Sequence, residues 1–164
     1  MARAAAIAWA ALMLCVPVVR SQTTGATAVD FTLRTLAGDS LTLSRLKGRP
    51  VFLNFWATWC TPCRAEMHDI DSTYRAHRPQ GLEVLAIDLT DEDRLKDVRR
   101  FVNELALSFP ILLDEEGKVW RRYAARGLPT SVFIDTAGVV RLVVPGPVGS
   151  ERLQQGLVEI LPTR

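Results

Sequence analysis

Two nearly continuous apolar runs, separated by a stretch with helical spacing, constrain the fold of this chain most. Residues 50–56 read Pro-Val-Phe-Leu-Asn-Phe-Trp, and residues 82–87 form the second run. Apolar runs of this length are typical of strands that are buried on both faces of a sheet. Between them, residues 61–77 carry apolar side chains at helical spacing. The three segments predict a βαβ unit at the centre of the fold.

Shorter elements flank this unit on both sides. Alternating runs over residues 29–33 and 40–43 surround a turn and predict an N-terminal hairpin. The pattern beyond the unit predicts a helix that starts at the acids 91–93 and continues through Leu105, a strand over 109–113, a hairpin over 131–144 and a last helix capped by Ser150. This order predicts an α/β fold: a mixed central sheet flanked by helices, with an N-terminal β-hairpin.

The first 21 residues differ in kind from the rest. Arg3 is followed by an uncharged apolar stretch from Ala4 to Val19, which is shorter than a membrane span of about 20 residues. This pattern indicates a signal peptide, cleaved after Ser21 or Ala26, or else an N-terminal anchor. The domain is therefore expected outside the cytoplasm, for example in a periplasm, either soluble or anchored. Residues 22–28 are interpreted as a linker, and residues 29–164 as one domain.

The charge balance argues against a nucleic acid partner. The chain has 20 basic and 18 acidic residues, and the excess is Arg3 and Arg20 of the leader. No basic patch remains in the mature domain, so no binding to nucleic acid is predicted.

Cysteine usage indicates chemistry and not cross-linking. Of the three cysteines, Cys15 lies in the leader, which leaves Cys60 and Cys63 in the domain. Exported domains that depend on disulfides for stability usually show more pairs at wider spacing. A bridge between Cys60 and Cys63 also closes a very small loop, which constrains the unfolded chain little. The pair is therefore expected to react.

The position of the pair suits thiol–disulfide exchange, which needs an attacking thiolate and a second thiol to release the mixed disulfide. Cys60 stands at the predicted helix N-terminus, where unpaired N–H groups and the helix dipole favour a thiolate. Pro62 suits the first turn of the helix, because an N–H group there has no acceptor within the helix and its absence costs no hydrogen bond. Cys63 lies one turn deeper. We therefore predict an oxidoreductase in which Cys60 attacks and Cys63 resolves.

A zinc site is the alternative that two cysteines at this spacing leave open. Structural zinc takes about four ligands, and the other candidates in the domain are His68 and His77. These two residues point apart on the predicted helix and are interpreted as solvated. No metal is therefore predicted, and no cofactor beyond the redox-active disulfide itself.

Glu66 lies at the edge of the apolar face of the same helix, three residues after Cys63. If burial desolvates this carboxyl group, its pKa rises, and it can exchange a proton with the resolving thiol. The spacing alone is equally compatible with an exposed glutamate that has no role.

Two separate motifs give the chain a resemblance to a known family. Residues 55–64, Phe-Trp-Ala-Thr-Trp-Cys-Thr-Pro-Cys-Arg, resemble the active-site segment of thioredoxin-like proteins. Gly127-Leu128-Pro129-Thr130 resembles the segment that carries their cis-proline. The region from Val29 to Leu161 is similar to the exported reductases typified by TlpA, ResA and CcmG. The resemblance implies a thioredoxin-like fold.

The resemblance also implies roles for particular residues. Pro129 is expected to be cis and to face the cysteine pair, and with Leu128 it lines the groove for the substrate backbone. Trp59, Thr61 and Pro62 complete that surface. Plain thioredoxin has a buried Asp where this chain has Asn54, which cannot take up a proton. The exported branch commonly has Asn there, and this assigns the proton-exchanging role to Glu66.

The function that the resemblance implies is reduction of protein disulfides outside the cytoplasm, as in cytochrome c maturation. Its clients would be apocytochrome c or copper-site assembly proteins, and its electrons would come from a membrane thiol donor of the DsbD or CcdA type. A copper-site assembly chaperone is one alternative, although such proteins use a wider cysteine spacing and a distant His. A peroxidase is the other, although Leu53 and Ala57 replace the Pro and Thr that peroxiredoxins have before their cysteine.

Overall fold

The computed structural model describes residues 23–162, and the predicted leader, residues 1–21, lies outside the described part. Seven strands form one sheet in the order β2-β1-β5-β4-β3-β6-β7. The strands are β1 (Thr32–Thr35), β2 (Ser40–Thr42), β3 (Val51–Trp56), β4 (Glu83–Asp88), β5 (Ile111–Leu113), β6 (Thr130–Ile134) and β7 (Val140–Pro145). The helices are α1 (Thr61–His77), α2 (Leu95–Glu104), α3 (Lys118–Arg122) and α4 (Ser150–Ile160), with short 3₁₀ turns η1 (Leu43–Leu46) and η2 (Arg78–Gln80).

Strand β3 lies inside the sheet, between β4 and β6, and all six of its residues are buried. It pairs in parallel with β4 and antiparallel with β6, while β1 joins β5 antiparallel. The predicted mixed sheet and the N-terminal hairpin of β1 and β2 are therefore confirmed. Successive β3 side chains point to opposite faces, which explains why the run is apolar almost throughout.

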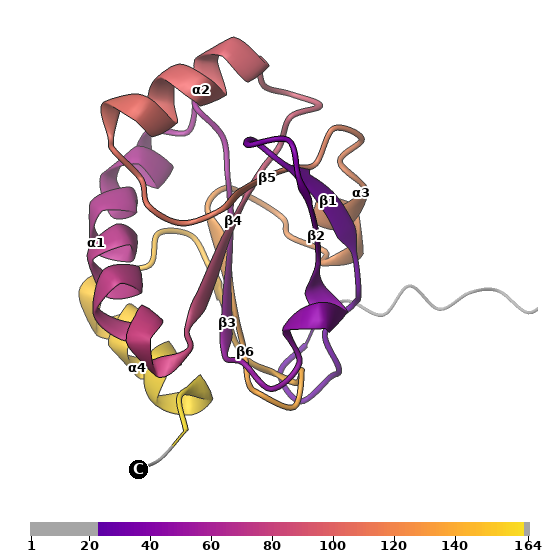
Figure 1. The fold of residues 1–164 in the computed structure, drawn as a ribbon, viewed down its shortest axis with the longest axis vertical. Helices are drawn as coiled ribbons and strands as arrows, with labels where there is room; N and C mark the ends of the chain where they lie inside the picture. The colour runs from indigo at the N-terminus through magenta and orange to yellow at the C-terminus, as the bar shows by residue number, and fades with distance from the viewer. Residues whose placement is uncertain (1–22, 163–164) are drawn as a thin grey trace, which may run out of the picture.

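Helices cover both faces of the sheet (Figure 1). On one face α1, α2 and α4 enclose a cluster that includes Trp56, Met67, Phe101 and Leu157. On the other face α3 packs with Phe55 and other apolar residues. Helix α1 has the bounds that its spacing predicted, because its buried positions recur at helical spacing over nearly five turns.

Two local predictions were wrong, and one short helix was not predicted at all. Helix α2 begins at Leu95, after the acidic run 91–93, because the Asp93 carboxylate accepts hydrogen bonds from a neighbouring loop. Ser150 is the first residue of α4 and makes no side-chain cap, since Gly149 occupies the N-cap position. Helix α3 was not predicted, because five residues are too few to show a helical period.

Residues 25–28, part of the predicted linker, lie beside the β6–β7 hairpin. The Gly25 N–H donates to the Val140 carbonyl at 2.7 Å, and the Val140 N–H donates to the Ala26 carbonyl at 2.9 Å. Thr27 forms an antiparallel bridge with Val139. Within residues 23–162, no helix combines the length and the apolar character that a membrane crossing requires.

Candidate active site

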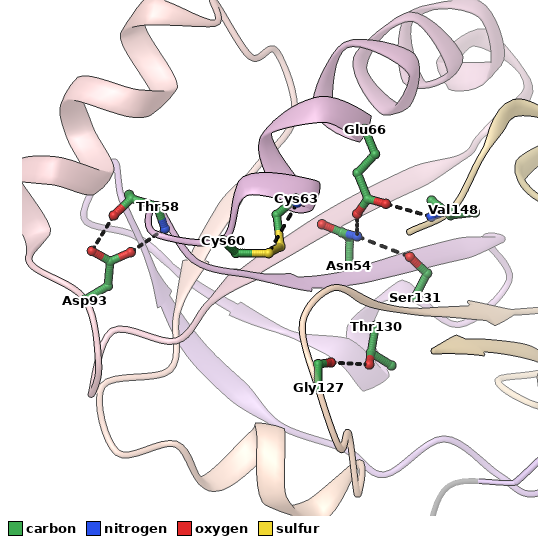
Figure 2. The surroundings of a disulfide bond; sticks show 10 residues. All are labelled: Asn54, Thr58, Cys60, Cys63, Glu66, Asp93, Gly127, Thr130, Ser131 and Val148. Atoms are coloured by element: carbon green, nitrogen blue, oxygen red, sulfur yellow. Dashed lines mark hydrogen bonds between the residues drawn. A yellow bond between two sulfur atoms is a disulfide. The ribbon is translucent and has the colours of Figure 1, made fainter. Parts of the chain in front are cut away.

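The cysteine pair lies where β3 leads into α1. Cys60 is the N-cap residue of α1, and Cys63 belongs to its first turn. A disulfide bond joins them, and the Cys63 N–H donates to the Cys60 sulfur at 3.2 Å (Figure 2). Cys60 keeps 5% of its surface exposed and Cys63 none. The deeper cysteine is therefore the one that was expected to resolve the mixed disulfide.

The surface around the pair is formed by residues next to the cysteines. Trp59 is 56% exposed, and its indole N–H donates to the Glu92 carbonyl at 3.2 Å. Thr61 and Pro62 are exposed in the first turn of α1, where proline leaves no donor unpaired. Trp56, in contrast, is fully buried in the core. The two tryptophans therefore differ as predicted, one at the surface and one beneath it.

Glu66 is the buried acid of the site. Only 5% of its surface is exposed, although it occupies the edge of the apolar face of α1. Its Oε1 accepts a hydrogen bond from Asn54 Nδ2 at 2.8 Å, and its Oε2 accepts one from the Val148 N–H at 2.7 Å (Figure 2). Strand β3, helix α1 and the connection from β7 to α4 therefore meet at one carboxyl group.

Burial raises the pKa of Glu66 to about 7, against the opposing effect of the hydrogen bonds from Val148 and Asn54. The carboxyl group is therefore partly protonated near neutral pH. Asn54 also donates to the Ser131 hydroxyl at 3.1 Å, and its Oδ1 has no partner among the described residues. Figure 2 shows this Oδ1 on the side of Asn54 that faces the disulfide.

The Leu128–Pro129 peptide bond is cis, as the resemblance implied. Thr130, the next residue, pairs with Phe55 near the carboxyl end of β3, which places Pro129 at the edge of the sheet where the cysteine pair lies. The Pro129 carbonyl accepts a hydrogen bond from Gly146, and the Thr130 hydroxyl donates to the Gly127 carbonyl. Leu128 is partly exposed, whereas Pro129 is buried.

A second loop holds the turn that precedes Cys60. The Asp93 carboxylate accepts hydrogen bonds from the Thr58 N–H at 2.6 Å and from the Thr58 hydroxyl at 2.7 Å (Figure 2). The Cys60 N–H closes this turn on the Ala57 carbonyl. Neither Thr58 nor Asp93 was predicted as a site residue from the sequence. The acidic run after β4 was the available signal, and it was interpreted only as a helix start.

Val148 and Ser131 also escaped prediction, because they reach Glu66 and Asn54 across separations of 82 and 77 residues. The two histidines lie on α1, where His68 is exposed and His77 is partly buried. Among residues 23–162, no group of three or more potential ligands is arranged to hold a metal ion.

Comparisons with known proteins agree with this geometry. Residues 24–143 match the AhpC/TSA family. The thiol–disulfide oxidoreductase ResA of Geobacillus thermodenitrificans is 38% identical over 138 residues, which span 84% of this chain and 78% of that protein.

Solved structures show the same similarity. StoA of Bacillus subtilis has 28% identity and a TM-score of 0.69, covering 80% of this chain and 98% of that one. A secreted disulfide oxidoreductase of Mycobacterium tuberculosis, homologous to DsbE of E. coli, has 26% identity and a TM-score of 0.70, covering 78% and 94%. The fold and the predicted chemistry are confirmed: this chain belongs to the AhpC/TSA family and, within it, to the ResA-like thiol–disulfide oxidoreductases.

Proposed function

We propose that this protein is an exported reductase of protein disulfides, in which Glu66 exchanges a proton with the thiol of Cys63. One observation carries the proposal: a buried carboxyl group, with a pKa of about 7, lies one helical turn after the resolving cysteine. Such a group can accept and return a proton near neutral pH. Asn54, its neighbour on β3, has an amide that cannot do so.

The catalytic cycle consists of two exchanges. The Cys60 thiolate attacks one sulfur of a client disulfide, and the other client sulfur leaves as a thiolate and takes a proton. Glu66 then accepts the proton of the Cys63 thiol, and the resulting thiolate attacks the Cys60 sulfur. The second client sulfur leaves as a thiolate and takes a proton, Glu66 releases the proton that it accepted, and the Cys60–Cys63 disulfide is formed. Two electrons have moved from the protein to the client, and a dithiol donor must restore them.

The client is proposed to lie across the exposed surface beside Cys60. One side of this surface is formed by residues at the start of α1 and just before it: Trp59, Thr61 and Pro62. The other side is formed by the Leu128–Pro129 segment. A client segment that lies extended there would bring its disulfide to Cys60. Leu128 is partly exposed and is proposed to contact such a segment.

Export and partners extend the proposal beyond the domain. The apolar pattern of residues 1–21 supports export, and a similar structure is described as secreted. We infer a role in cytochrome c maturation, with apocytochrome c or a copper-site assembly protein as client and a membrane thiol carrier of the DsbD or CcdA type as donor. The similarity to ResA and to a homologue of DsbE supports this role.

A redox titration tests the direction of electron flow. The protein is equilibrated in dithiothreitol or glutathione buffers, and the fraction of free Cys60 and Cys63 is measured by alkylation. A reductase should give a potential near that of thioredoxin, about −270 mV, whereas a strong oxidant lies near about −120 mV. A value near the latter would overturn the assignment as a reductase.

The Glu66→Gln variant tests the proton exchange. The rate at which Cys63 resolves a mixed disulfide should lose its inflection near pH 7, because the variant has no titrating group there. Asp69→Asn is the matched control, since Asp69 is an exposed acid on the same helix. An unchanged profile in Glu66→Gln would remove Glu66 from the mechanism and leave the exchange at the cysteines intact.

The two alternative functions have direct assays. Tight stoichiometric Cu(I) binding by the reduced domain, lost on replacing His68 or His77, would favour a copper chaperone. Rapid consumption of hydrogen peroxide in stopped flow would favour a peroxidase. We expect neither result, because the cysteine spacing and the residues before Cys60 do not match those functions.

A further inference from the structure

The chain buries a second carboxyl group that the exchange cycle above does not use. Asp88 is the last residue of β4 and is fully buried, in register with Trp56 on β3. Its Oδ1 lies 2.8 Å from the Thr90 hydroxyl, which donates to it. Its Oδ2 receives no hydrogen bond from any donor in residues 23–162. A buried carboxylate oxygen without a donor is costly unless a proton resides on the group.

The carboxyl group of Asp93 lies against that of Asp88, near enough for a hydrogen bond between them. Asp93 in turn accepts three hydrogen bonds, two from Thr58 and one from the Arg94 N–H at 2.8 Å. Three donors therefore already supply hydrogen bonds to its two oxygens. The proton that the pair needs therefore belongs on Asp88, where it satisfies the orphan Oδ2 and removes the repulsion between two negative charges.

The electrostatic surroundings agree with this placement. Burial, and then the neighbouring Asp93 and Asp91, raise the pKa of Asp88 to about 8, although the hydrogen bond from Thr90 opposes the shift. Two carboxyl groups that share one proton behave in this way at many sites.

The other charged groups nearby are engaged elsewhere. On α2, Arg94 and Arg100 pair with Asp97, and on α1 Arg64 lies over Phe101 and pairs with Glu104. After β5, the Asp114 carboxyl accepts hydrogen bonds from the start of α3. Arg121 of α3 lies 3.8 Å from Asp91. Among the acids that act on Asp88, Asp93 is the one that contributes by a hydrogen bond as well as by its charge, whereas Asp91 contributes by its charge alone.

The geometry points to Asp88 and Asp93 as positioning residues for the attack of Cys60. Asp88 donates a proton to Asp93, and Asp93 holds Thr58, two residues before the attacking cysteine, by its N–H and its hydroxyl. The same loop holds Trp59 through the Glu92 carbonyl. Ionisation of Asp88 places a second negative charge beside Asp93 and loosens the turn. The inference rests on exchange at Cys60 and is independent of the role of Glu66.

The pH dependence of the Thr58 N–H resonance tests directly whether Asp88 carries a proton. In ¹⁵N spectra of the oxidised protein, in which neither cysteine titrates, the Thr58 N–H resonance should shift with a midpoint near pH 8. Asp88→Asn should abolish this midpoint, because an amide at this position donates to Asp93 at every pH. Glu92→Gln is the matched control, since it removes an exposed carboxylate from the same loop, and it should keep the midpoint. Glu66→Gln should keep it as well.

The reaction of Cys60 supplies the second readout. The second-order rate constant for attack of the reduced protein on oxidised glutathione should fall about tenfold in Asp93→Asn, which loses a charge-assisted hydrogen bond. Thr58→Val should also slow the attack, and Thr58→Ser should restore it, because only the serine keeps the hydroxyl donor. Above pH 8, the rate constant of the wild-type protein should fall below the value that the fraction of Cys60 thiolate predicts. In Asp88→Asn the rate constant should follow the thiolate fraction without this fall.

Two results would overturn the inference. One is a Thr58 N–H resonance that does not shift with pH in the wild-type protein, or that shifts with the same midpoint in Asp88→Asn. The other is a rate of attack that is the same in Thr58→Val, Thr58→Ser and the wild type. Either result leaves the exchange cycle and the role of Glu66 as they stand, since those are tested by the resolving step.

Discussion

Glu66 receives hydrogen bonds from two donors, Asn54 Nδ2 and the Val148 N–H, and donates none in its ionised form. This arrangement limits how far burial can raise the pKa of the group, because both bonds favour the carboxylate. The result is an acid tuned to neutral pH and not one that is permanently protonated. A proton exchanger needs this intermediate value, since it must bind a proton in one step and release it in the next.

The raised pKa of Glu66 predicts a pH-dependent change in stability. The folded-state pKa is about 7 against an ordinary 4.5, so the protonated form stabilises the fold below pH 4.5, and that stability is lost as pH rises through 7. Glu66→Gln removes this loss. Its free energy of unfolding relative to wild type should therefore rise by about 3 kcal/mol between pH 4.5 and 8. Urea unfolding of the oxidised protein at several pH values measures the difference, and Asp69→Asn should show no such trend.

Asn54→Asp provides a complementary prediction at the same position. It would place a second carboxyl group 2.8 Å from Glu66, so that the two acids share one proton. The inflection that reports loss of the shared proton should then lie at higher pH than the inflection of the wild-type protein. The pH profile of that step measures the shift. An inflection that remains near pH 7 would contradict the idea that Asn54 sets the proton affinity of Glu66.

The sequence could identify the residues of the site but not all of their partners. Cys60, Cys63 and Glu66 share one helix, so their spacing was enough to group them. Val148 and Asp93 reach the site from other segments of the chain. Their local sequence gives no signal that they contact Glu66 and Thr58. Asp88 was assigned to no function because a single acid at the end of an apolar run resembles an ordinary strand end.

Helix α4 packs closely against the sheet at a glycine, Gly156. A Cβ atom on Gly156 would lie closer to the ring of Phe133 on β6 than van der Waals contact permits, and that ring is fully buried. The absence of a side chain therefore lets α4 pack against the sheet. This close approach also supports the connection from β7 to α4, which carries the Val148 N–H.

Gly156→Ala should therefore destabilise the protein, although alanine is the better helix former by about 1 kcal/mol. Overpacking of a buried contact typically costs about 1–3 kcal/mol, and the net loss should appear as a lower midpoint of urea unfolding. Combining the change with Phe133→Leu should recover part of the loss. Gln154→Ala, an exposed position on the same helix, is the control. A stabilised Gly156→Ala would mean that the ring moves aside freely.

Long elements were more predictable than short ones for a physical reason. Helix α1 and strands β3 and β4 bury many residues at a regular period, and the period is visible in the sequence. Helix α3 has five residues and is held by hydrogen bonds from its first turn to the Asp114 carboxyl. Because the stabilising acid lies before the helix, no periodic pattern in the sequence predicts α3.

For the molecule as a whole, the order of elements was sufficient to predict a mixed sheet and a site at its carboxyl edge. A strand that continues into a helix places the intervening residues at that edge, whatever the rest of the chain does. The order could not show that α1, α2 and α4 share one face, because that arrangement depends on side-chain packing between distant segments.

The segment before β1 should contribute to the stability of the whole domain. Residues 25–28 exchange backbone hydrogen bonds with Gly138 and Val140, at distances between 2.7 and 2.9 Å. A chain that begins at residue 29 should be less stable than one that begins at residue 23, by about 1–3 kcal/mol. Thermal and urea unfolding of the two chains would measure this. Equal stability would show that the segment acts only as a linker.

The point at which residues 25–28 attach also determines how they lie relative to the cysteine pair. Residues 25–28 join the domain at the β6–β7 turn, which lies at the amino end of β3, whereas the cysteine pair follows its carboxyl end. Residues 25–28 are therefore attached at the end of the sheet opposite the disulfide. A copy tethered to a surface by its N-terminus would present Cys60 outward, toward partners that approach from solution, and the length of its tether would set how far above the surface it reacts.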